Sequence, residues 1–261
     1  MKIVELWDFA DPAKSESRFR DAAATASGDW RLELQTQIAR TYSLRKRYAE
    51  AHRLLDEIEP QLGAAGLKPR LRYLLERGRT FNSAGDKAAA RPLFVQAWEL
   101  GRAGGEEDLA IDAAHMVAIV EGGEKALDWN RQALAMAQSA HDPAARRWKA
   151  SVLNNIGVEL KELGRYPEAL ASFQQALAAY EERGDPRTIR IARWMVANTL
   201  RLMGRNDEAL GMQLALEREL KAGGEVDPYV LEELAALYEA RGEPDKARPY
   251  AERLRTLEKG S

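Results

Sequence analysis

Large apolar residues recur along this chain every three or four positions, the spacing that places them on one face of an α-helix. Residues 150–183 show this pattern best. A first helix carries Leu153 and Leu160, a turn follows at residues 164–167, and a second helix carries Phe173. The pattern predicts a helical hairpin, in which two apolar faces pack against each other.

The second helix of this hairpin also has a small residue at a fixed place, where the first helix crosses it. A side chain larger than alanine there would push the two helix axes beyond their usual separation of about 8–10 Å. Equivalent small residues recur along the whole chain at intervals of 36 to 43 residues: Ser15, Ala51, Ala90, Ala126, Ala169, Ala209 and Ala247. The repetition predicts an all-α protein built from one hairpin used many times.

Residues 150–183 order their positions as Leu-x2-Ile-Gly-x2-Leu and then Ala-x3-Phe-x2-Ala. This order resembles the tetratricopeptide repeat (TPR). The intervals exceed the 34 residues of a plain repeat, and the connections carry the surplus in glycine-rich turns. In this length, and in the Ala-x-Pro placement at Pro92 and Pro249, the chain is similar to the repeats of kinesin light chains and bacterial peptide-sensing regulators. The resemblance implies a right-handed α-solenoid of stacked hairpins.

The repeat spacing predicts a domain organisation without an internal boundary. Residues 1–30 form an N-terminal capping half repeat, in which Asp11-Pro12 starts a helix and Trp7 and Phe9 cover the end of the stack. Residues 31–261 form six TPR-like hairpins in one continuous solenoid. Pro92 and Pro249 fall about one turn inside second helices, so we expect slight kinks there, not breaks.

Composition narrows the function classes. The formal net charge is −2 and the pI is about 6.1, which gives no electrostatic footprint for nucleic acid or an anionic membrane. No cysteine is present, which excludes disulfides and thiolate chemistry. No apolar run reaches the ~18 residues of a membrane helix, and charges interrupt the N-terminal segment before it resembles a signal peptide. We therefore expect a cytoplasmic protein.

The sequence carries little that indicates catalysis. It has no GxxxxGK[ST] or GxGxxG phosphate loop and no HExxH zinc motif. Its three histidines, His52, His115 and His141, lie in different repeats or in a connection, without the spacing of metal ligands. We expect no enzymatic activity, no cofactor and no metal.

Binding is the better hypothesis. The TPR resemblance implies that first helices line a concave groove, and that groove-facing positions are those outside the apolar pattern. The candidate partner-binding residues at such positions are Arg40, Arg79, Asn82, His115, Asn154, Asn155, Lys161, Trp194, Asn198 and Arg201. Tyr229 and several glutamates hold similar positions in the last repeat.

Each candidate also has a structural interpretation. Asn154 and Asn198 offer a donor and an acceptor, which suits clamping a peptide backbone, but the same amides also suit bonds between neighbouring helices. Trp194 is either an anchor pocket in the groove or a packing residue. Arg40, Arg79 and Arg201 indicate an anionic partner if they act together, and solvated charges if they do not.

The sequence thus predicts a non-catalytic scaffold that binds a peptide or helical segment of another protein in its groove. A self-assembling structural protein is the first alternative, so a monomer and a homodimer both remain open. A peptide-sensing regulatory subunit without a DNA-binding domain is the second. The residues at the carboxylate-clamp positions of chaperone-binding repeats do not match that clamp, which argues against a heat-shock chaperone partner.

Overall fold

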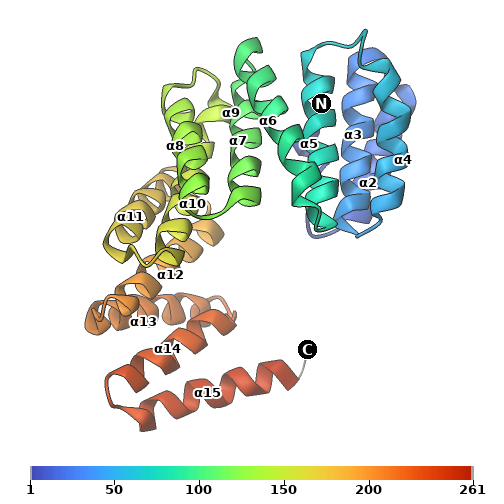
Figure 1. The fold of residues 1–261 in the computed structure, drawn as a ribbon. Helices are drawn as coiled ribbons and strands as arrows, with labels where there is room; N and C mark the ends of the chain where they lie inside the picture. The colour runs from blue at the N-terminus through green and yellow to red at the C-terminus, as the bar shows by residue number, and fades with distance from the viewer. Residues whose placement is uncertain (1, 260–261) are drawn as a thin grey trace. The chain divides into compact units, whose positions relative to one another are not determined.

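The computed structural model describes residues 2–259, and all the regular secondary structure in that range is helical. The helices form successive antiparallel pairs (Figure 1). Contacts divide the chain into two compact units, one ending at Trp148 and one starting at Lys149. Each unit is described by itself.

The first unit contains a short N-terminal part and three helix pairs. Its helices are α1 (Ile3–Leu6), α2 (Pro12–Thr25), α3 (Gly28–Leu44), α4 (Tyr48–Ile58), the 3-10 turn η1 (Glu59–Gln61), α5 (Leu67–Ser83), α6 (Lys87–Gly104), α7 (Glu107–Glu121), α8 (Gly123–Ser139) and α9 (Pro143–Arg146). Helix α9 is a single turn in the connection between α8 and α10. There, Asp142 caps the helix by accepting a hydrogen bond from Ala144 N, and Pro143 occupies the first helical position.

The second unit contains three further pairs. Its helices are α10 (Trp148–Glu162), α11 (Tyr166–Arg183), α12 (Pro186–Leu202), α13 (Asn206–Ala222), α14 (Pro228–Ala240) and α15 (Pro244–Lys259). Asp185 and Asp227 cap α12 and α14, each followed by a proline at the first helical position. Helices α6 and α15 run through Pro92 and Pro249 without a break, as expected.

The small residues that define the repeat are buried in every pair. Ser15 and the six alanines of the series are at most 2% exposed. Phe94 and Phe173 fill the space beside them and lie directly over glycines of the facing helix. A Cβ atom on Gly78 would come within 2.5 Å of Phe94, and one on Gly157 within 2.6 Å of Phe173. These two pairs therefore require glycine, because no side chain fits under the ring.

The N-terminal aromatic residues fold onto the first helices. Trp7 stacks on Phe9 at 4.6 Å between ring centroids and packs edge-on against the buried Phe19 at 5.1 Å. The indole of Trp7 also donates a hydrogen bond to Gln37 of α3, at 3.1 Å. The N-terminal segment thereby covers part of α3, including Gln37.

Candidate functional site

The first helices of the hairpins (α3, α5, α7, α10, α12 and α14) carry all the residues that the sequence proposed for partner binding. In the first unit several of these residues form an ionic ladder. Arg40 of α3 lies 3.4 Å from Glu76 of α5, and Arg79 lies 2.8 Å from the same carboxylate. Arg79 also pairs with Asp112 of α7. The ladder thus joins three successive helix pairs.

Electrostatics fix the charges in this ladder. Burial alone would raise the pKa of Asp112, but the guanidinium groups of Arg79 and Arg40 together lower it. Arg79 is desolvated as well, and its two carboxylate partners still raise its pKa. Both groups stay ionised, and the cations of Arg40 and Arg79 are neutralised by the chain itself. Within residues 2–259, Arg40 Nε and Glu76 Oε2 are buried without a hydrogen-bond partner.

His115 and Asn82 complete the candidates of the first unit. The ring of His115 faces Trp148 at 5.6 Å, and Trp148 donates its indole N–H to Asp108 at 2.8 Å. Burial lowers the pKa of His115, with Asp112 opposing and Arg79 reinforcing the effect, so the imidazole is neutral at pH 7. Asn82 lies partly buried in the last turn of α5.

The second unit has a shorter ladder of the same kind. Lys161 of α10 donates to Asn198 Oδ1 at 3.3 Å, and Asn198 Nδ2 donates to Glu233 of α14 at 2.6 Å. Arg201 closes the group with two hydrogen bonds to Glu233, at 2.8 and 2.9 Å. The oxygen and the nitrogen of the buried Asn198 amide therefore connect α12 to the first helices α10 and α14. These bonds agree with the structural interpretation of Asn198, in which the amide bonds neighbouring helices. Asn154 and Asn155 lie partly buried on α10.

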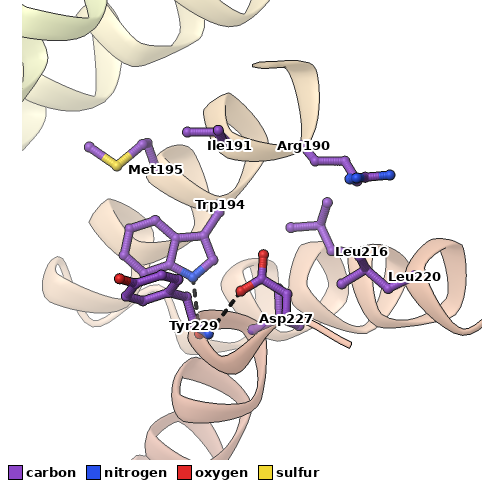
Figure 2. Close-up of a pocket in the computed structure, with 9 residues that line it drawn as sticks. Arg190, Ile191, Trp194, Met195, Leu216, Leu220, Asp227 and Tyr229 are labelled. Atoms are coloured by element: carbon purple, nitrogen blue, oxygen red, sulfur yellow. Dashed lines mark hydrogen bonds between the residues drawn. The ribbon is translucent and has the colours of Figure 1, made fainter. Parts of the chain in front are cut away.

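A pocket of about 270 Å³ opens in the second unit, between α12, the end of α13 and the start of α14 (Figure 2). Trp194 forms one wall and donates its indole N–H to the backbone oxygen of Tyr229, at 3.1 Å. The two rings meet edge to face at 6.0 Å. The residues that line the pocket are Arg190, Ile191, Trp194, Met195, Leu216, Leu220, Asp227, Tyr229 and Val230.

The local sequence explains the pocket. Gly224 adopts a left-handed conformation (φ +70°) just after α13, and Asp227-Pro228 starts α14 three residues later. This short connection brings the first turn of α14 against α12 and α13. Leu216, Leu220 and Val230 belong to a buried apolar cluster against which Trp194 packs. Trp194 thus has one side on the core, and Ile191 beside it is 51% exposed.

Sequence reasoning found part of this site. It placed Trp194 and Tyr229 at groove positions, and both line the pocket. It missed Leu216 and Leu220, because they belong to a second helix and follow the ordinary apolar pattern. It also missed Asp227, whose Asp-Pro signature indicates a helix cap and nothing more.

Other kinds of site have no support in the part of the chain that the structure describes. No group of three or more His, Asp or Glu side chains among those residues is arranged to hold a metal ion. None of the helices within residues 2–259 combines the length and apolar character needed to cross a membrane.

Comparison with protein families finds one match: residues 106–182 fit the model of the tetratricopeptide repeat. No curated protein sequence matches the chain. Among solved structures, the apo form of RapI aligns with a TM-score of 0.78 at 12% identity, over 96% of this chain and 72% of that one.

Two further structures have the same fold. A signal-transduction ATPase with a tetratricopeptide repeat sensor, from Pyrococcus horikoshii, aligns with a TM-score of 0.76 at 14% identity. It covers 95% of this chain, which spans only 39% of that protein's length. NprR in complex with its cognate peptide NprX aligns with a TM-score of 0.58 at 15% identity, over 94% of this chain and 73% of that one. At such identities the likeness establishes the fold.

Proposed function

We propose that this chain, an all-α solenoid protein with tetratricopeptide repeats, is a non-catalytic interaction module that binds a peptide segment of another protein. The binding site is the pocket between α12, α13 and α14. The observation that carries the proposal is an apolar cavity that the fold builds from three helices, with two aromatic side chains in its lining.

The chemistry of the pocket suits an anchoring side chain. Its lining is mainly aliphatic and aromatic, and Tyr229 at its edge is 64% exposed. Exposed aromatic residues beside a well-packed apolar pocket are the usual centres of binding energy in protein interfaces. The cations and amides of the two ladders are a weaker basis for recognition, because bonds within the chain already engage Arg79, Asn198 and Arg201.

The comparisons support a peptide as the occupant. NprR shares the fold and was crystallised with its cognate peptide, and the repeats of the Pyrococcus horikoshii ATPase are described as a sensor. For this chain the same use of the scaffold is a proposal, since identity to either protein is low.

Selection from a random displayed-peptide library against the full chain tests the proposal. Enriched peptides are then synthesised with a fluorophore, and their affinities are measured by fluorescence anisotropy. Ile191→Asp places a charge at the pocket mouth and is expected to weaken binding at least about tenfold, the effect typical of an interface hot spot.

Ile119→Asp is the matched control. Ile119 is also an isoleucine on a first helix and is 44% exposed, but it belongs to α7 of the first unit and is not among the residues that line the pocket. Equal loss of affinity in both variants, or in neither, contradicts the pocket as the binding site. A selection that enriches no peptide contradicts the proposed function itself.

A further inference from the structure

The lining of the apolar pocket includes a carboxylate, that of Asp227. Asp227 Oδ1 accepts the capping hydrogen bond from Tyr229 N at 2.9 Å. The second carboxylate oxygen points into the space between Trp194 and Leu216 (Figure 2). A carboxylate oxygen directed into an apolar cavity favours a ligand that brings a positive charge, because burying an unpaired charge costs free energy.

The one arginine in the lining is already paired within the chain. Arg190 lines the pocket and pairs with Glu225 at 3.0 Å, so its charge is balanced by a residue of the same loop as Asp227. Arg187 lies one turn earlier on α12 and does not contribute to the lining. The pocket therefore presents negative charge to an incoming group.

The rest of the lining favours one kind of cationic side chain. Trp194 and Tyr229 offer aromatic faces, which attract cations and stack best with the planar guanidinium of arginine. Ile191, Leu216 and Leu220 offer an aliphatic wall for a methylene stem. A cavity of about 150 Å³ already holds a benzene molecule, so 270 Å³ accommodates a long side chain.

We propose that this pocket binds an arginine side chain of the peptide partner, with its stem against the aliphatic wall and its guanidinium on Asp227, beside the ring of Trp194. The inference rests on the proposed function and names the residue that the pocket recognises.

Three small probes test it on the full chain: Nα-acetyl-arginine amide, its uncharged isostere Nα-acetyl-citrulline amide, and Nα-acetyl-norleucine amide. The protein is labelled with 5-fluorotryptophan, and a Trp194→Phe variant identifies the fluorine resonance of Trp194. The arginine probe is expected to shift this resonance saturably, with an affinity at least tenfold above that of the citrulline probe.

Asp227→Asn removes the charge and keeps a residue that caps a helix as well as aspartate does. In this variant the arginine probe is expected to fall to the affinity of the citrulline probe, while the norleucine probe is unchanged. Circular dichroism checks that α14 still forms.

The outcomes separate the inference from the proposed function. Norleucine binding as tightly as arginine, with no effect of Asp227→Asn, overturns arginine recognition and leaves the pocket as an apolar anchor. A Trp194 resonance that no probe shifts also overturns the inference, and the displayed-peptide selection then decides independently whether the chain binds peptides.

Discussion

At the residue scale, the repeats differ at one position of the second helix, the position that faces the first helix of the same hairpin. Phe94 and Phe173 occupy it over glycines. In two other hairpins the residues at the same sequence separation are an alanine and an amide: Ala114 and Asn130, and Ala197 and Gln213. Gln213 is fully buried, and within residues 2–259 neither its amide nitrogen nor its amide oxygen has a hydrogen-bond partner. The sequence showed that Gln213 replaces an aromatic residue, but it did not show the burial of an unpaired amide.

We predict that Gln213→Met stabilises the protein. The substitution keeps the length of the side chain and removes two buried polar atoms, each of which lacks a hydrogen bond. The free energy of unfolding is expected to rise by about 1–2 kcal/mol. Urea denaturation measures it, with Gln174→Met at an exposed site of α11 as the control. A loss of stability would mean that ordered water satisfies the amide.

A second residue-scale prediction compares two glycines. In Gly157→Ala the new Cβ would meet the Phe173 ring at 2.6 Å, so the core must shift, at an expected cost of about 1–3 kcal/mol. Gly211 lies inside α13 with no atom within 4 Å of a Cβ position. Gly211→Ala should therefore stabilise by about 0.5–1 kcal/mol, the ordinary helix preference. Equal effects of the two changes in chemical denaturation would disprove the packing assignment.

At the element scale, polar side chains connect each first helix to the next. Arg40 bonds to Glu76, Arg79 to Asp112 and Asn198 to Glu233, at sequence separations of 36, 33 and 35 residues. In the sequence these residues lie outside the apolar pattern. It did not show that neighbouring first helices stand close enough for them to bond with each other, because that depends on how successive hairpins stack.

We predict that Asp112→Asn destabilises the protein by about 3 kcal/mol at pH 7, because it leaves the largely buried Arg79 without this charged partner. The pKa of Asp112 is lowered in the folded state, so its contribution is present above the usual value of 3.8 and is lost as the pH falls through the folded value. Thermal melts of wild type and variant should therefore converge in acid. A difference that does not depend on pH would contradict the ionic origin.

His115 is a second source of pH-dependent stability. It differs from Asp112 because it is a base whose charged form is disfavoured by burial. Its pKa is lowered, chiefly by burial, so the unfolded chain takes up a proton more readily than the folded one. Stability is therefore expected to fall as the pH drops below the usual value of 6.5. His115→Phe should reduce the difference in melting temperature between pH 7.5 and about 5.5. An unaltered difference in His115→Phe would assign the acid sensitivity to other groups.

At the scale of the whole molecule, the sequence predicted the features that recur in every repeat. It did not predict the pocket, which follows no repeat. The series of buried small residues, the hairpins and the proline-containing helices follow from local pattern, because each depends on residues close in sequence. The pocket depends on three helices and on the connection that orients Asp227. Such an arrangement leaves no periodic signal, and the sequence alone gave only Trp194 and Tyr229 as its markers.

The division of this helical-repeat chain into two compact units also predicts how far along the chain a destabilising substitution acts. In repeat proteins each repeat is stabilised mainly by its nearest neighbours, so a destabilising substitution acts over a short range of sequence. Asp112→Asn should raise hydrogen exchange in α5 and α7 and leave α12 and α14 protected. Gly157→Ala should raise exchange in α10 and α11 and leave α3 and α4 protected. Hydrogen-exchange mass spectrometry resolves these segments, and a uniform rise across residues 2–259 for either variant would show that the chain unfolds as one cooperative body.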